Sequence, residues 1–494
     1  MRRLVRTAIP AFSGALLLLA TPAFAQSSPA APEKLALGDW LFSPTMEARF
    51  RAEYRADAPD LGGTDFFGKN TPRVRNAWVV MDRSRLGLGA ERGAIRAQIT
   101  LQDARALGGS LSDAVVGTPT DRFAKFAPYE AYAEAHGSGA RPHYLRLGRQ
   151  AVVWGEGRLI GNAEFSPSGR ALDAARAHLT LGNLDLEALG ALLEMPGPLG
   201  SSFGDRDGPS STGTQLYGVT AKYSFDPLLK AELFGIARIA RSNGGDLDGS
   251  RFALSRLSSQ KYTGSARLSG EGGGWSWGAE GALQGGSASS LGSATPGTDI
   301  AAWAAYGHLE KVVDQLLLAP TFRLEGSYAS GDDGHGKYKQ FDPLLPDPQR
   351  FHGPMDLFGW SNMIDLGASV RMTPANDTTV TLGYRYARLV QAQGEWIGGY
   401  MTAVGSAIRP PLTSSPRTTT NLTNEKDLGH EIDVSIAWRP FVPVEIRGGW
   451  SGLLLGTGAK AIMAAHGRGS HETDGVYPSS LAQYAYLQAT VTIP

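Results

Sequence analysis

Charged and apolar residues alternate strictly along the chain from Met46 to Ala56. The even positions of this segment are wholly apolar, and the odd positions, from Glu47 to Arg55, are wholly charged. Successive side chains of a strand point to opposite faces, so the pattern predicts a strand with one apolar and one charged face. The alternation recurs along most of the chain, in segments that include 83–102, 144–148, 175–180, 219–225, 275–282, 322–328, 380–386, 432–439 and 484–493.

Such a sheet can cross a membrane if it closes on itself, because closure leaves no unpaired edge in the lipid. Short turns such as Arg92-Gly93 alternate with long polar connections. The sequence therefore predicts an all-β fold, a transmembrane antiparallel β-barrel with short periplasmic turns and long extracellular loops. About ten residues per strand gives roughly 16 to 20 strands. The long connections are expected at 195–213, 240–261, 330–354, 397–426 and 456–479.

The N-terminus has the pattern of a secretory signal peptide over residues 1–25. Three arginines precede an apolar run over residues 8–20, and a small-x-small cleavage site ends at Ala25. We therefore expect export to the outer membrane, a periplasmic segment over residues 26–40 and a barrel over residues 41–494. An uncleaved N-terminal anchor is the alternative, which the short apolar run disfavours.

Composition narrows the possible functions. The chain has 47 basic and 47 acidic residues, a balance that argues against nucleic-acid binding. It contains no cysteine, so no disulfide framework is available. No HExxH, GxSxG or P-loop motif occurs, and we expect no enzymatic activity, no cofactor and no metal site. The acidic loop Asp332-Asp333-Gly334-His335 matches no calcium-loop spacing and is interpreted as a solvated turn.

Two blocks of sequence contain motifs that the alternation of a strand does not explain. The first extends from Gly148 to Arg176 and includes Trp154-Gly155-Glu156-Gly157-Arg158. The second extends from Ser327 to Asn362 and includes Gly353-Pro354-Met355-Asp356-Leu357-Phe358-Gly359-Trp360. In order and spacing these blocks resemble the alginate export family of outer-membrane barrels, over most of the chain. The resemblance implies an 18-stranded, monomeric barrel.

The resemblance also implies a lumen lined by arginines and acidic residues, suited to an anionic polysaccharide. From the first block we expect six residues on the substrate path, namely Arg149, Arg158, Arg170, Arg176, Glu164 and Asp173. Alternation alone assigns seven further arginines to the lumen, namely Arg49, Arg51, Arg83, Arg85, Arg96, Arg323 and Arg385. Arginine rings select anions, and guanidinium groups bind carboxylates in a bidentate manner. Acidic residues are interleaved with these arginines, so structural pairing across the sheet is the alternative role for each one.

These observations predict a channel for passive export or diffusion of an anionic polysaccharide or sugar acid. Its expected partners are outer-membrane lipid and lipopolysaccharide, the saccharide itself and periplasmic polysaccharide-secretion proteins. A porin for small solutes is the nearest alternative. A barrel enzyme, such as a lipase or deacylase, and a plugged structural or adhesive barrel are the others. The chain ends in Val491-Thr492-Ile493-Pro494, without the aromatic last residue that many outer-membrane barrels carry.

Overall fold

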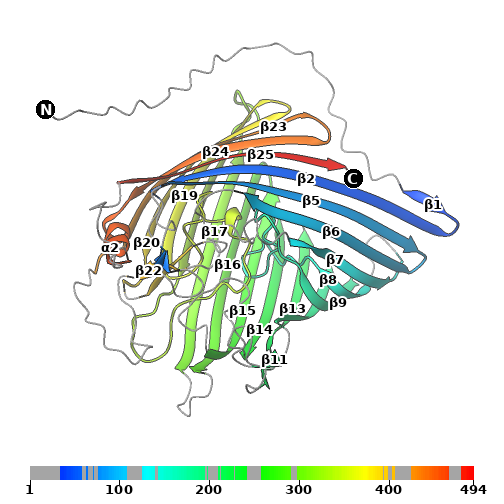
Figure 1. The fold of residues 1–494 in the computed structure, drawn as a ribbon, viewed down its shortest axis with the longest axis horizontal. Helices are drawn as coiled ribbons and strands as arrows, with labels where there is room; N and C mark the ends of the chain where they lie inside the picture. Colours follow the sequence, from blue (N-terminus) through cyan, green and yellow to red (C-terminus); the bar gives the residue numbers. More distant parts are fainter. Residues whose placement is uncertain are drawn as a thin grey trace.

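The alternating segments form the wall of a closed barrel in the computed structural model (Figure 1). The structure describes residues 34–57, 63–64, 70–71, 76–107, 125–138, 143–194, 197–198, 210–211, 213–226, 228–241, 257–290, 298–392, 394–398, 403–406, 424–466 and 480–493. In these residues, 18 antiparallel strands pair in chain order, and the barrel closes where the last strand pairs with the first. The predicted fold class is therefore confirmed.

The wall strands differ in length, and the shortest ones flank inward-folded loops described below. Their bounds are β2 (Trp40–Ala56), β5 (Asn76–Arg92), β6 (Ile95–Leu107), β7 (Lys125–His136), β8 (Tyr144–Gln150), β9 (Leu172–Leu181), β10 (Leu184–Glu194), β13 (Gly213–Asp226), β14 (Leu229–Arg241), β15 (Leu257–Gly272), β16 (Trp275–Ser290), β17 (Thr298–Val312), β18 (Thr321–Ala329), β19 (Met363–Ala375), β20 (Thr378–Leu389), β23 (Asp427–Phe441), β24 (Val444–Leu455) and β25 (Leu481–Ile493).

Several short elements are not part of the wall. The strand β1 (Leu35–Leu37) pairs with the start of β2, and α2 (Thr457–His466) lies at the opposite end of the barrel (Figure 1). The remaining short elements are β3 (Gly63–Thr64), β4 (Asn70–Thr71), β11 (Gly197–Pro198), β12 (Ser210–Ser211), η1 (Pro348–Arg350), β21 (Glu395–Ile397) and β22 (Ala403–Ser406). The predicted signal peptide lies outside the described residues, as does most of the predicted periplasmic segment. Among the described residues, no helix is both long and apolar enough to cross a membrane.

Turns of a few residues join the strands at one end of the barrel, and long connections join them at the other. The β5–β6 turn, for example, contains only Gly93 and Ala94, whereas 33 residues separate β18 from β19. This asymmetry was predicted. The connection expected over residues 240–261 is shorter than predicted, because β14 extends to Arg241 and β15 already begins at Leu257.

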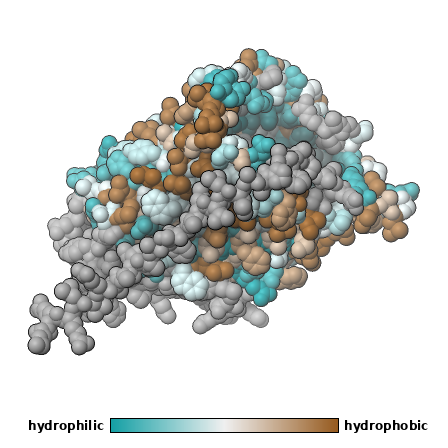
Figure 2. Space-filling model, turned by 90° about the horizontal axis from the view of Figure 1, so that it is seen from above, coloured by the Kyte–Doolittle hydropathy of each residue, from teal (hydrophilic) through white to brown (hydrophobic). Residues whose placement is uncertain are grey.

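The outer face of the wall is apolar along most strands. Phe50 on β2 is 58% exposed, and Leu86 on β5 and Leu283 on β16 are similarly open. Hydrophobic residues recur over the described surface visible in Figure 2. The opposite face of the same strands carries buried polar and charged side chains. This division is what a barrel surrounded by lipid requires.

Two long connections fold into the barrel. We call residues 151–171, between β8 and β9, the Glu164 loop, and residues 330–362, between β18 and β19, the Trp360 loop. The two pair with each other, since the Gly161 amide donates to the Leu345 carbonyl (2.8 Å) and the Leu345 amide to the Leu159 carbonyl (3.0 Å). Apolar side chains of both loops pack in one buried cluster with inward-facing wall residues such as Leu216 and Phe234.

Candidate functional site

Four arginines of β2 and β5 form one patch on the inner face of the wall, which we call the arginine row (Arg49, Arg51, Arg83 and Arg85). Antiparallel pairing of the two strands places Arg49 directly opposite Arg83. All four side chains are almost completely buried, whereas their sequence neighbour Phe50 is open on the outer face. Alternation within two adjacent strands is thus sufficient to gather four positive charges on one side of the sheet.

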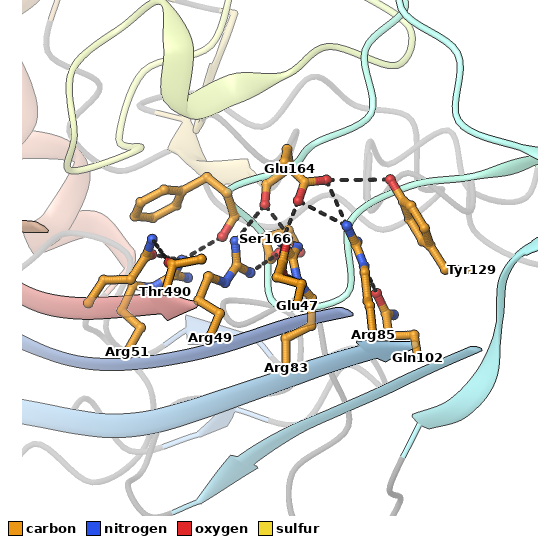
Figure 3. Close-up of polar contacts among 12 residues, drawn as sticks. Glu47, Arg49, Arg51, Arg83, Arg85, Gln102, Tyr129, Glu164, Ser166 and Thr490 are labelled. Atoms are coloured by element: carbon orange, nitrogen blue, oxygen red, sulfur yellow. Dashed lines mark hydrogen bonds and ion pairs between the residues drawn. The ribbon is translucent and has the colours of Figure 1, made fainter. Parts of the chain in front are cut away.

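The tip of the Glu164 loop, residues 163–167, lies on the arginine row (Figure 3). Arg49 donates to the carbonyl oxygens of Glu164 (2.8 Å) and Ser166 (2.7 Å). Arg51 donates to the carbonyl of Phe165 (2.6 Å), and its guanidinium stacks 3.8 Å from the centre of the Phe165 ring. The arginines therefore hold the tip mainly through its backbone.

The Glu164 carboxylate is the only charged group of this tip, and it lies between two arginines. Arg85 reaches its two oxygens at 3.0 and 3.2 Å, Arg83 is paired with Oε1, and the Tyr129 hydroxyl donates to Oε2 at 3.4 Å. Burial alone would raise the pKa of the Glu164 carboxyl, but Arg83, Arg85 and Arg49 outweigh it and hold this pKa below its usual range. The carboxylate is therefore ionised at neutral pH.

Wall residues supply further partners to the same arginines. Arg83 Nε donates to Glu47 (2.7 Å), Arg51 pairs with Glu53 (2.7 Å) and Arg85 Nε donates to Gln102 (2.8 Å). Buried guanidinium groups need such partners, because removal of a charge from water is costly unless it is paired and hydrogen-bonded.

Arg158 and Arg170 lie in the Glu164 loop and hold it against its surroundings. Arg170 donates to the carbonyls of Gly161 (3.0 Å), Leu345 (2.7 Å) and Pro346 (2.9 Å), which ties the two loops together. The buried Arg158 guanidinium lies 3.1 Å from the centre of the Tyr306 ring, and the Phe351 ring is its second aromatic neighbour. In this arrangement the contacts of Arg158 and of Arg170 hold the loop in place.

The remaining inward-facing arginines of the prediction are paired with carboxylates of the wall. Arg176 contacts Glu187 (2.7 Å), and Arg385 contacts both Asp365 and Glu325 (2.5 Å each). Arg96 pairs with Glu91 and Glu134, and Arg323 with Glu310 and Glu325. The alternative of structural pairing therefore describes the contacts of these four arginines.

Arg149 and Asp173 do not face the lumen, which corrects the expectation for both. They pair directly across β8 and β9 and share an outer face with Leu147 and Leu179. Arg149 contacts Asp173 (3.2 Å) and donates to the carbonyl of Pro128 (3.0 Å), and it is the last residue of β8 that pairs with β7, opposite Ala131. The pair closes the base of the Glu164 loop on the outside of the barrel.

Several contributors to the arginine row were absent from the prediction. The Phe165 and Ser166 contacts use backbone carbonyls, which any residue provides, so no side-chain pattern marks them. Tyr129 lies at a register shift of β7, which alternation alone does not reveal. Gly169 is a residue whose type could have indicated a close approach, because its φ is +63° and a side chain there would displace the Arg85 guanidinium. In the described part of the chain, no group of His, Asp or Glu side chains is arranged to hold a metal ion.

Comparison with solved structures finds barrels of the same fold among bacterial outer-membrane proteins. It is similar to OccAB2 of Acinetobacter baumannii (12% identity, TM-score 0.51, 91% of this chain and 97% of that one). It is also similar to OccK2 (OpdF) of Pseudomonas aeruginosa (10% identity, TM-score 0.51, 92% and 98%) and to opdK of the same organism (11%, 0.50, 91% and 98%). At such low identity the likeness concerns the fold alone.

Sequence comparison identifies the family. No curated protein matches the chain. The family model for alginate export matches residues 43–191 and 245–450, which together make up most of the chain and include both inward loops. The chain therefore belongs to the alginate export family, whose fold is that of outer-membrane channels.

Proposed function

We propose that this protein is an outer-membrane channel that passes an anionic polysaccharide or a sugar acid by passive diffusion. The observation that carries the proposal is the arginine row, which concentrates four guanidinium groups on one side of the lumen. Guanidinium groups bind carboxylates in a geometry that an ammonium group cannot provide. A polymer of carboxylated sugars would meet positive charge where the Glu164 loop narrows the lumen.

Family membership supports the same proposal and its cellular setting. The fold and the family imply the outer membrane. In that setting we expect lipid and lipopolysaccharide around the apolar wall. The chain would act as a monomer without catalysing a reaction, and would receive polymer from periplasmic polysaccharide-secretion proteins.

Ion selectivity and saccharide block of the refolded protein in a planar bilayer test the proposal. We expect a reversal potential that indicates anion selectivity, and a current that uronic acid oligomers block. Arg85→Ala should weaken both effects, because it removes a positive charge from the arginine row. Arg149→Ala is the matched control, since that arginine lies on the outer face. A weakly selective current without block would contradict the proposal.

A porin for small solutes is the alternative, and one observation favours it. Carboxylates neutralise the arginines on β18–β20, where Arg323 and Arg385 are fully engaged with Glu325 and its neighbours. A lumen in which every arginine is compensated would show little preference for anions. Equal permeability to small neutral and charged solutes, without saccharide block, would support this alternative.

A further inference from the structure

The loop tip offers the arginine row the same chemical groups that an acidic saccharide would offer. It presents one carboxylate, three backbone carbonyl oxygens and the face of the Phe165 ring. A uronic acid residue likewise carries one carboxylate, several oxygen acceptors and an apolar ring face. We infer that residues 163–167 are a built-in stand-in for the ligand, and that an acidic saccharide opens the lumen by displacing them from the arginine row.

The charges at the arginine row favour replacement of the Glu164 carboxylate by one sugar carboxylate. Glu47 and Glu53 belong to the wall and stay with their arginines, whereas Glu164 belongs to the loop. Loss of Glu164 alone would leave buried guanidinium groups of Arg83 and Arg85 without their shared carboxylate, which is costly. A sugar carboxylate in the same place restores the balance, so the exchange changes no net charge.

Access and backbone conformation also favour exchange at this tip. The Glu164 side chain remains 41% exposed, whereas the Arg83 side chain below it is only 2% exposed, so a ligand meets the carboxylate first. Ala163 has a φ of +47°, a left-handed conformation that is unfavourable for a residue with a side chain. In the described residues, Nη2 of Arg85 is buried without a hydrogen-bond partner, which leaves a donor for an incoming acceptor.

Only the tip needs to move. The stem of the Glu164 loop is paired with the Trp360 loop through Gly161 and Leu345, and Arg170 reinforces this junction. Apolar residues of the stem, such as Ile160, are completely buried in the shared cluster. The inference rests on the proposed function, and it adds the regulation of the same site by its own ligand.

Thiol labelling measures the displacement directly. The chain contains no cysteine, so Ser166→Cys introduces a single thiol, buried beside the arginine row. We expect slow labelling by a water-soluble maleimide, and about tenfold faster labelling when uronic acid oligomers are added, as for a tenfold shift in the tip population. A neutral oligosaccharide of equal length should have no effect.

Two charge variants separate displacement from a general change of potential. In the S166C background, Glu164→Gln should speed labelling without any saccharide, because the tip loses its ion pairs. Glu47→Gln removes a wall carboxylate from the same Arg83 and should leave labelling slow. Equal acceleration by both variants would overturn the inference.

The outcomes for the inference and for the proposed function are distinguishable. If oligomers block the current but leave S166C labelling unchanged, the saccharide passes without displacing the tip and the inference is wrong, while the proposed function stands. If oligomers neither block the current nor speed labelling, the proposed function fails and the inference fails with it.

Discussion

The tip of the Glu164 loop and the apolar part of the Trp360 loop are held in the barrel by different forces. The tip of the Glu164 loop is attached to the arginine row by hydrogen bonds and ion pairs, with one aromatic ring as its apolar contact. The Trp360 loop instead buries Phe341, Leu344 and Trp360 in the apolar cluster, each with almost no exposed surface. The loop tip is therefore held by polar contacts with the wall, whereas these three residues of the Trp360 loop belong to an apolar core.

This difference determines which loop a ligand can move. Apolar burial is favoured over water as a whole, and a dissolved saccharide offers no replacement for it. Hydrogen bonds and ion pairs contribute little net free energy when an equivalent partner is available, so they can be exchanged. We therefore expect the Trp360 loop to stay inside the barrel when a ligand binds, and the tip of the Glu164 loop to be displaced.

The largest effect is expected from removal of the Trp360 ring. Its side chain is 2% exposed and packs edge-on against Phe341, so Trp360→Ala should cost about 3–5 kcal/mol of loop docking. Both loops share this cluster, and both should detach. Single-channel recordings should show a much larger and less selective conductance than that of the wild type.

The matched control for this variant is Trp303→Ala on β17. Trp303 is also large, but it faces outward and is 46% exposed. Its removal should leave the conductance unchanged. If Trp360→Ala instead retains the wild-type conductance, apolar packing does not hold the loops and the proposed contrast is wrong.

A smaller effect, confined to the tip, is expected from Arg83→Ala. Arg83 donates to the Glu164 carbonyl (3.1 Å) and pairs with its carboxylate, so its loss should weaken the tip by about 2 kcal/mol. Labelling of S166C should accelerate roughly 30-fold, since 1.4 kcal/mol corresponds to a factor of ten. Arg176→Ala, which removes an inward arginine of β9 that pairs with Glu187, should leave labelling slow. Acceleration by both would mean that the tip responds to lumen charge in general.

The sequence was sufficient to predict the strands of the wall and the direction of their side chains. It was not sufficient to predict that the two loops fold into the barrel. Alternation alone placed Arg49, Arg51, Arg83 and Arg85 on one face, because β2 and β5 are regular. The alternation expected over residues 144–148 stopped one residue before Arg149, which the resemblance assigned to the lumen. In the structure β8 includes Arg149, which shares the outer face of Leu145 and Leu147. The inward path of the loops depends on contacts between residues more than 100 positions apart, many of them through backbone carbonyls, which leave no local pattern.

The two loops should also respond to pH in opposite directions. The lowered pKa of Glu164 means that its contribution is present above the usual carboxyl pKa of about 4.3 and is lost as the pH falls through the lowered value. Burial raises the pKa of Asp356 in the Trp360 loop to about 8, against the opposing effect of Arg55. That loop is therefore destabilised progressively as the pH rises from about 3.9 towards 8.

Conductance as a function of pH measures both responses in one protein. Wild-type conductance should increase at the acidic end, where the tip is released, and at the alkaline end, where the Trp360 loop loosens. Glu164→Gln should abolish the acidic response alone, and Asp356→Asn the alkaline response alone. A single variant that abolishes both would show that the loops move as one unit.

The smallest effect is expected at the base of the Glu164 loop, where Arg149 and Asp173 pair on the outer face. Both side chains are substantially exposed, and such pairs contribute about 0–1 kcal/mol. Arg149→Ala should therefore leave the reversal potential, the saccharide block and S166C labelling at wild-type values, although it removes an arginine next to the loop. A loss of anion selectivity comparable to that of Arg85→Ala would place Arg149 on the ion path. It would also mean that the wall near β8, rather than the tip, controls the lumen.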